Sequence, residues 1–369
     1  MSKASPPKKQ RLHQSRGNAR NRIAAGKRSR AMHRSIPSRN PTPKPGFDVN
    51  TKAYSYKEAI LYSILNANSK ASKTYEHAAT FSRVLLSLTR STKMLGYSFG
   101  EETGKELYKI VSEGKNYYWY EESIPELVSF LEKATGYPVS YQFLHNGLRI
   151  RLHSRNALGL GTNIHSFEAG IISGFVTAAS RQPVKIREIA CTSNGADYCE
   201  FIPSAYSSEQ EKEIEMEDAV YKFAKHIAPA IKGQQAQNNF VPLVYHALLM
   251  QPLLDSRYVE ALDIISGYAG LKVAESLFDD KHPNISKIRD YLSKSATLLN
   301  FGAPRLKSTG KHDNLNMEFV FKPEISKKEY VEMSLAFING IVSKASNSKV
   351  SFEMKGDGEG YILKMKENK

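Results

Sequence analysis

Cysteine and tryptophan are nearly absent from this sequence of 369 residues, which has two cysteines, Cys191 and Cys199, and one tryptophan, Trp119. Two cysteines are too few for a disulfide scaffold, and they suit the reducing environment of the cytoplasm. No run of 18 apolar residues occurs, so the sequence predicts no transmembrane helix. The N-terminus is basic but lacks the apolar stretch of a secretory signal. We therefore expect a cytoplasmic protein without a disulfide framework.

Acidic residues are missing from the first 47 positions, which contain 13 Lys and Arg and no Asp or Glu. The whole chain has 52 Lys and Arg against 37 Asp and Glu, a formal net charge of +15, so the other 322 residues carry only +2. The segment has few large apolar side chains and ends in four closely spaced prolines, so it cannot bury a core of its own. We expect residues 1–47 to be a disordered cationic arm with a Pro-rich spacer.

A cationic arm of this kind binds polyanions, because each Lys or Arg that neutralises a phosphate releases a counterion. The excess of Arg over Lys favours phosphate contacts and stacking on bases, so RNA or the ribosome is favoured over DNA. Two alternatives stay open, an arm that only solubilises the chain and an arm that attaches to anionic lipid. The residues expected to contact nucleic acid are Lys8, Lys9, Arg11, Arg16, Arg20, Arg22, Lys27, Arg28, Arg30, Arg34 and Arg39 in the arm, with Arg149 and Arg151 in the body.

The nearly neutral body reads as helices and strands that occur twice in a similar order. In the first half the patterns predict helices over 56–68, 74–94, 98–113, 124–134, 164–180 and 207–232, and strands over 138–145, 147–153, 184–191 and 198–203. In the second half they predict helices over 240–254, 256–278, 285–297 and 326–345, and strands over 299–304, 316–322, 349–355 and 360–366.

An internal duplication is also indicated by the residues themselves. Positions 174–186 align without gaps on positions 340–352, with five of 13 residues identical. We therefore predict an α+β protein with two tandem repeats of a helix-covered antiparallel sheet. The expected divisions are the arm at 1–47, a first domain at 48–232 and a second, degenerate repeat at 239–369.

One stretch of the body carries a family resemblance. Its features are Gly96-Tyr97 and Gly100, the helix of residues 166–174, the strand of residues 184–190, and two cysteines eight positions apart around Gly195 and closed by Glu200-Phe201. On these features residues 94–203 resemble the 4-vinyl-reductase-like domain family, which is related to the TRAPP vesicle-tethering subunits. The resemblance implies a helix-covered antiparallel sheet, a pocket for a small molecule or hydrocarbon, and in some members a zinc ion held with the help of the two cysteines.

The cysteines are the first candidate site. Cys191 and Cys199 would lie at the end of one strand and on the strand that faces it, so both thiolates could contact one metal ion. A structural zinc site needs four ligands, and the candidates to complete it are Glu188, His153 and His165. Two other interpretations remain, buried thiols that only pack and a redox pair. Zinc is therefore the candidate cofactor.

The aromatic run around the single tryptophan is the second candidate site. Tyr117, Tyr118 and Trp119, together with Tyr97, could line a pocket for a small apolar ligand, or could anchor a loop to the core. The sequence has no Gly-rich phosphate loop, no Gly-x-Ser-x-Gly elbow and no His-Glu-x-x-His, so we do not expect an enzyme.

These observations predict a non-catalytic accessory or regulatory binding protein of archaeal type. It would dock on nucleic acid through its arm and carry a duplicated domain of the small-molecule-binding kind, alone or as a homo- or heterodimer. The alternatives are a ligand- or metal-binding sensor or scaffold, and a TRAPP-like membrane tether. In both of these the arm is incidental.

Overall fold

The computed structural model divides the chain into two units, Met1–Lys52 and Ala53–Lys369. The residues that it describes all belong to the second unit, and they are 55–66, 72–145, 147–154, 157–204, 214–234, 239–278, 283, 285–302, 305–308, 317–321, 325, 327–346, 350–356 and 361–367. The predicted arm, residues 1–47, lies outside them. Helices and antiparallel sheets are both present, which confirms the α+β class. Within the described segments, no helix combines the length and the apolar character needed to span a bilayer.

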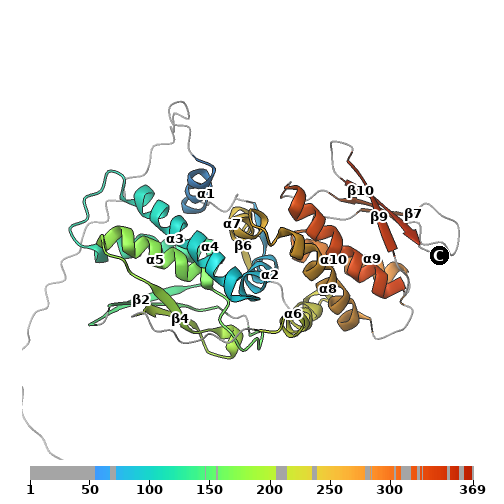
Figure 1. The fold of residues 1–369 in the computed structure, drawn as a ribbon, viewed down its shortest axis with the longest axis horizontal. Coiled ribbons are helices and arrows are strands. Elements are labelled where there is room, and N and C mark those ends of the chain that lie inside the picture. Colours follow the sequence, from blue (N-terminus) through green and yellow to red (C-terminus); the bar gives the residue numbers. More distant parts are fainter. Residues whose placement is uncertain are drawn as a thin grey trace, which may run out of the picture. The chain divides into compact units, whose positions relative to one another are not determined.

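The first half of the body is an antiparallel sheet with helices packed on it (Figure 1). Its elements are α1 (Tyr56–Leu65), β1 (Lys73–Tyr75), α2 (Glu76–Ser87), α3 (Arg90–Ser112), the short turn η1 (Tyr120–Ser123), α4 (Ile124–Thr135), β2 (Val139–Leu144), β3 (Gly147–Leu152), α5 (Ser166–Ser180), β4 (Ile186–Ala190), the short turn η2 (Thr192–Asn194) and β5 (Cys199–Pro203). The strands lie in the order β2-β3-β5-β4. Helix α6 (Met216–Ile231) follows; its predicted beginning at residue 207 lies outside the described residues.

The second half of the body has the same order of elements. They are β6 (Phe240–Pro242), α7 (Leu243–Leu254), α8 (Val259–Leu277), α9 (Ile285–Leu298), β7 (Arg305–Ser308), β8 (Met317–Phe321), α10 (Lys328–Ser346), β9 (Val350–Gly356) and β10 (Tyr361–Glu367). Its strands lie in the order β7-β8-β10-β9, which repeats the order of the first sheet. Descent of the two halves from one duplicated segment stays a prediction.

The two halves contact each other through their first elements. The segments that were predicted to start helices at residues 74 and 240 instead begin with β1 and β6, which pair antiparallel with each other. Behind this pair α2 packs on α7. Phe81 of α2 lies 4.9 Å from Phe223 of α6 and 6.2 Å from Phe337 of α10, measured between ring centroids. One hydrophobic core therefore includes residues of both halves.

Helices α3 and α5 approach each other closely because glycines lie at their contact. A Cβ atom on Gly100 would lie 2.2 Å from the carbonyl oxygen of Phe167, and one on Gly174 would lie 1.9 Å from that of Glu101. Any side chain at these positions would collide with the backbone of the facing helix. The pair α8 and α10 is built in the same way, with Gly340 against Gly267.

Two predicted boundaries are wrong. The predicted helix break at Gly96 lies inside α3, and the helices separate instead at Thr89, whose side chain forms a capping box with Thr92. The strand predicted over 299–304 is not formed. There α9 ends in a turn, in which Asn300 has a φ of 61° and the N–H of Phe301 bonds to the carbonyl of Ala296. The first strand of this sheet, β7, begins only at Arg305.

Candidate metal centre

Four potential metal ligands lie together in the first half of the body. They are His165, Glu188, Cys191 and Cys199, and one ligand atom of each lies within 4.8 Å of the others. His165 precedes α5, Glu188 lies on β4, Cys191 follows β4, and Cys199 begins β5. All four side chains are buried. The structure thus brings both predicted cysteines together with two of the three predicted supplements.

The third predicted supplement, His153, is not part of this group. Its side chain is exposed, and its Nε2 lies 3.1 Å from the hydroxyl of Ser140. The signal that could have excluded it was in the sequence, because residues 148, 150 and 152 alternate with 149, 151 and 153. The first set is buried in the sheet, so the second set points away from the core.

A tight turn places the two cysteines opposite each other. The carbonyl of Cys191 accepts hydrogen bonds from the N–H groups of Asn194 and Ala196, which closes the turn η2. Gly195 has a φ of 89°, a conformation that glycine adopts without strain. The chain then reverses direction, so Cys199 faces Cys191 with the two sulfur atoms 3.8 Å apart.

The distances between ligand atoms match those of a tetrahedral zinc site. Cys191 Sγ lies 3.8 Å from Cys199 Sγ and 3.5 Å from His165 Nδ1. Zinc–ligand bonds of about 2.3 Å to sulfur and about 2.05 Å to nitrogen, at tetrahedral angles, separate two sulfurs by roughly 3.8 Å and sulfur from nitrogen by roughly 3.6 Å. His165 Nδ1 lies 2.9 Å from Glu188 Oε1, which is the distance of a direct hydrogen bond. Two thiolates, an imidazole and a carboxylate form a donor set that fits zinc.

Both sulfur atoms have hydrogen-bond donors beside them. The backbone N–H of Thr192 donates to Cys199 Sγ at 3.4 Å. The hydroxyl of Ser193 lies 3.0 Å from Cys191 Sγ, and also 2.7 Å from the carbonyl of Thr162. Donors of this kind stabilise thiolate charge around a bound metal.

Burial and charge act against each other in the site. Burial opposes protonation of His165, but the neighbouring Glu188 and Cys191 outweigh it and raise the pKa of this imidazole to about 10. Burial, a hydrogen bond with Cys199 and the Glu188 carboxylate raise the pKa of the Cys191 thiol. A divalent cation replaces the protons when it binds such ligands, so metal uptake releases them.

The residues of the predicted aromatic pocket are differently placed. Tyr97 lies on α3, where its hydroxyl accepts a hydrogen bond from the N–H of Ile186 at 3.1 Å. Tyr117 is half-buried, whereas Tyr118 and Trp119 are 87% and 71% exposed on the loop before η1. The structure therefore does not gather these four side chains around one described cavity.

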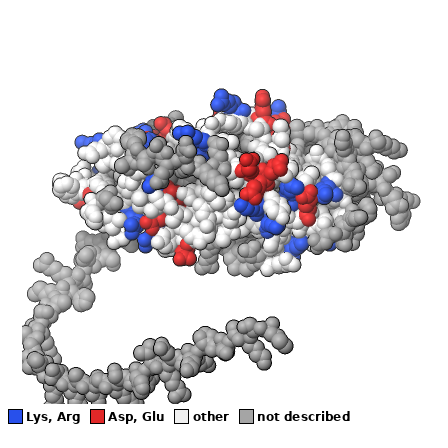
Figure 2. Space-filling model, turned by 60° about the horizontal axis from the view of Figure 1, so that its bottom comes forward, with Lys and Arg blue, Asp and Glu red and all other residues white. Residues whose placement is uncertain are grey.

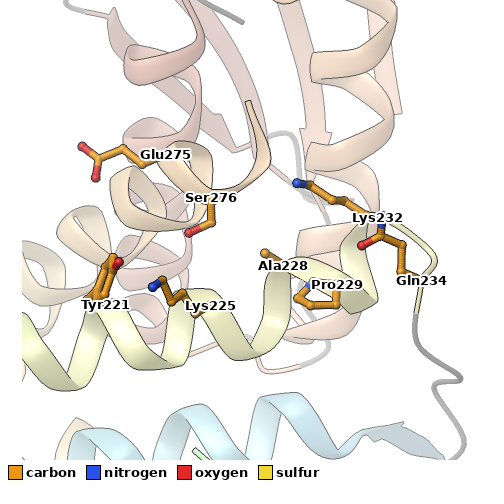
Figure 3. Close-up of a pocket in the computed structure, with 8 residues that line it drawn as sticks. All are labelled: Tyr221, Lys225, Ala228, Pro229, Lys232, Gln234, Glu275 and Ser276. Atoms are coloured by element: carbon orange, nitrogen blue, oxygen red, sulfur yellow. The ribbon is translucent and has the colours of Figure 1, made fainter. Parts of the chain in front are cut away.

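A cavity of about 340 Å³ lies instead between α6 and α8 (Figure 3). It is lined by Tyr221, Lys225, Ala228, Pro229, Lys232, Gln234, Glu275 and Ser276.

The two predicted nucleic-acid contacts of the body are already paired. Arg149 and Arg151 of β3 both contact Glu200 of β5, at 3.1 and 2.7 Å. On the face shown in Figure 2, basic and acidic side chains are interspersed. The other predicted contacts, Lys8 to Arg39, lie outside the described residues.

The sequence analysis missed a buried charged cluster next to the site. Arg83 of α2 donates from Nε to Glu168 Oε1 at 2.7 Å, and the hydroxyl of Tyr245 of α7 donates to the same oxygen at 2.6 Å. These three side chains are at most 1% exposed. The available signal was a charged residue in each of two otherwise buried helix faces.

The comparison with protein-family models agrees with this location. Residues 153–204 match the model of the 4-vinyl-reductase-like domain, and this stretch contains all four clustered ligands. The resemblance stated from the sequence is thereby confirmed for these residues, while the relation to TRAPP subunits stays a prediction. Neither the curated proteins nor the solved structures contain a match to the chain.

Proposed function

Since the family match encloses the four clustered ligands, we propose that this chain is a non-catalytic binding protein stabilised by one structural zinc ion. The observation that carries the proposal is the set of distances among His165, Glu188, Cys191 and Cys199, which suits a tetrahedral ion. Four protein ligands complete zinc coordination, so no position is left open for water or substrate. The site therefore has a structural and not a catalytic character.

The zinc ion would act as a cross-link between helix and sheet. His165 belongs to the start of α5, while Glu188, Cys191 and Cys199 belong to the adjoining ends of β4 and β5. One ion bound to all four would fix the helix on the edge of the sheet. In a domain of the small-molecule-binding type, this would hold the ligand-binding frame in shape.

Metal analysis of the purified full-length protein tests the proposal. We expect one zinc per chain, and a lower melting temperature after removal of zinc by a chelator. Cys191→Ser and Cys199→Ser should each abolish zinc retention. Ser334→Ala, which changes a buried hydroxyl of α10, should retain zinc and serves as the control. A folded wild-type chain that takes up no zinc would contradict the proposal.

A second proposal concerns residues 1–47. Their 13 basic and zero acidic residues support docking on RNA or a ribonucleoprotein. RNA binding should be measured from about 50 to about 200 mM salt, for the full chain and for a variant with the arm arginines replaced by glutamine. We expect the affinity of the unchanged chain to fall by roughly tenfold or more over this range, and the variant to bind weakly throughout.

Binding that is equal in both proteins, or independent of salt, would exclude this role of the arm. Anionic vesicles are the competing partner, and they are tested in the same salt series. Binding to vesicles without binding to RNA would favour the membrane alternative.

A further inference from the structure

Two buried polar atoms without a hydrogen-bond partner lie one helical turn apart at the start of α5. They are Nε2 of His165 and Oε2 of Glu168, in side chains that are 0% and 1% exposed. Buried polar groups are unfavourable unless they are paired. An imidazole nitrogen and a carboxylate oxygen are also complementary, because the N–H of the first can donate to the second.

The usual task of a glutamate at this position is already taken by another residue. Glu168 is the third residue of α5, from which a glutamate ordinarily bonds back to the N-cap backbone N–H. The N-cap is His165, and its backbone N–H donates instead to Glu188 Oε2 at 3.1 Å. Glu168 therefore does not cap its own helix, and its burial needs another explanation.

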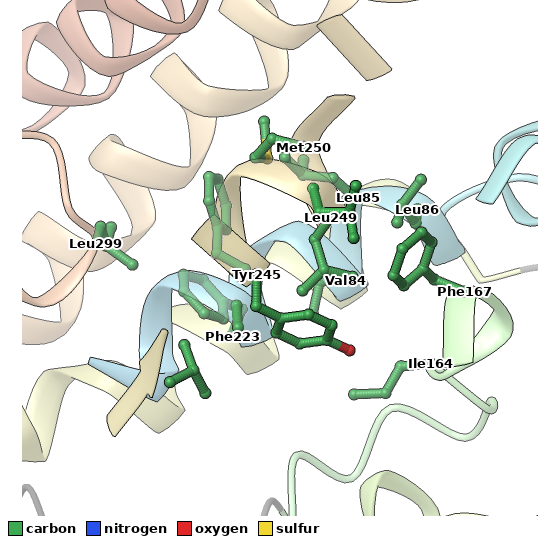
Figure 4. Close-up of a cluster of buried hydrophobic side chains, with 14 of the residues drawn as sticks. Val84, Leu85, Leu86, Ile164, Phe167, Phe223, Tyr245, Leu249, Met250 and Leu299 are labelled. Carbon is green, nitrogen blue, oxygen red and sulfur yellow. The ribbon is translucent and has the colours of Figure 1, made fainter. Parts of the chain in front are cut away.

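One oxygen of Glu168 is fixed by two other helices. Oε1 accepts hydrogen bonds from Arg83 of α2 at 2.7 Å and from Tyr245 of α7 at 2.6 Å. Figure 4 shows the hydroxyl of Tyr245 directed toward Ile164 and Phe167, beside the beginning of α5. These bonds orient the carboxylate and leave Oε2 for a further partner.

The charges also place Glu168 within reach of the metal ligand. Burial opposes its ionisation, but the charges of Arg83 and His165 and the hydrogen bonds from Tyr245 and Arg83 lower the pKa of this carboxyl. A carboxylate at this place thus remains an acceptor for the imidazole.

We infer that Glu168 is a positioning residue of the metal centre, to which Nε2–H of His165 donates when Nδ1 binds the metal. This inference rests on the proposed zinc site. Nδ1 is the ring atom that faces Cys191 and Glu188, at 3.5 and 2.9 Å, so Nε2 carries the proton in the metal-bound tautomer. Histidine ligands of metals usually donate their second N–H to a carboxylate or carbonyl, which fixes the orientation of the ring.

The same bonds join the metal centre to the second half of the body. From the metal they run through His165 and Glu168 to Tyr245, which lies on α7. Helix α7 packs on α2 where the two halves meet. The sensitivity of the metal to changes at Tyr245 is therefore a further consequence.

Zinc affinity and the cobalt spectrum test the inference in the full chain. Zinc affinity is measured by competition with a chromophoric chelator for wild type, Glu168→Gln and Tyr245→Phe. Glu168→Gln should weaken zinc binding about 10- to 100-fold and shift the d–d bands of the Co²⁺-substituted protein. Tyr245→Phe should act in the same direction but less. Glu200→Gln changes another buried carboxylate of the same half, which contacts Arg149 and Arg151, and should leave both readouts unchanged.

A double-mutant cycle separates positioning from a general loss of stability. His165→Cys supplies a thiolate ligand that has no second N–H, so Glu168→Gln should not alter zinc affinity in that background. In wild type, NMR of the imidazole should show the Nε2–H tautomer with a proton protected from exchange. This measurement decides the question even where Glu168→Gln does not fold.

The outcomes are distinct. Zinc uptake by wild type together with unchanged zinc affinity and cobalt bands in Glu168→Gln would overturn the inference and leave the zinc site standing. In that case Oε2 serves the unpaired guanidinium nitrogens of Arg83. The same conclusion follows if zinc-loaded wild type lacks the Nε2–H tautomer. A wild-type chain that takes up no zinc overturns the proposed function together with the inference.

Discussion

The hydroxyl of Ser193 is a contact by which a single residue adjusts the metal centre without being a ligand. It lies 3.0 Å from Cys191 Sγ, where it lowers the cost of a buried thiolate. Ser193→Ala should therefore weaken zinc binding about tenfold, with one zinc still bound at saturation. Chelator competition measures this, with Ser82→Ala of α2 as a buried control. An unchanged zinc affinity would show that this contact does not matter to the ion.

A pair of histidines makes the stability of the body sensitive to acid. The rings of His77 of α2 and His226 of α6 have their centroids 5.5 Å apart. Burial, and then the charge of His226, lower the pKa of His77 to about 4, and burial lowers that of His226. The unfolded chain then binds more protons than the folded one below about pH 6.5, so stability is complete above that value and falls as the pH approaches 4.

The expected loss from His77 alone is about 2 kcal/mol between pH 7 and pH 4, after allowance for its partial exposure. Denaturant unfolding at both pH values measures it. His77→Phe should reduce this loss, and His145→Gln, at an exposed position, should not. Equal acid sensitivity of His77→Phe and wild type would contradict this explanation.

At the residue scale the sequence could identify the ligands better than their environment. Cys191, Cys199, Glu188 and His165 were all expected near the metal, because two cysteines around a tight turn define where a site must be. The partner of Glu168 could not be found in this way. Arg83 lies 85 positions earlier in the chain, and only the packing of α2 on α5 brings the two together.

The contact of α3 with α5 depends on glycine, and substitution there should be costly. A Cβ atom at Gly100 or at Gly174 would lie 2.2 or 1.9 Å from a backbone oxygen of the facing helix, so the helices must move apart. Gly100→Ala and Gly174→Ala should each lower the free energy of unfolding by about 1–3 kcal/mol or more. Denaturant unfolding measures this.

Gly267→Ala of α8 is the matched control for these substitutions. Its added Cβ would lie 3.5 Å from the nearest atom, an ordinary contact. Alanine is the better helix former by about 1 kcal/mol, so this variant should be as stable as wild type or more stable. A similar loss in all three variants would refute the account of the close helix contact.

At the scale of elements, most helices and strands could be predicted from periodicity, and the errors have physical causes. Gly96 reads as a helix break, yet in α3 it packs against Leu86 and Ser166, with its space filled by tertiary contacts. The apolar residues after α9 read as a strand. Phe301 is instead held in the core by a helix-terminal turn, which hydrophobic pattern alone does not reveal. The short strands β1 and β6 become strands only by pairing with each other.

For the whole molecule, the shared core predicts that the two halves unfold together. Phe81 of the first half contacts Phe337 of the second as well as Phe223, and β1 pairs with β6. Calorimetry of the full-length protein should therefore show one cooperative transition for the body, with equal calorimetric and van't Hoff enthalpies. Removal of zinc should shift this whole transition to lower temperature. Two separate transitions, of which only one responds to the chelator, would contradict a common core.

X-ray absorption at the zinc edge of the purified full-length protein tests the central claim most directly. Coordination by Cys191, Cys199, His165 and Glu188 predicts four ligands, two sulfur atoms at about 2.3 Å and two nitrogen or oxygen atoms at about 2.0–2.2 Å. A zinc ion surrounded only by nitrogen and oxygen would contradict the proposed centre, as would the absence of zinc from a correctly folded chain.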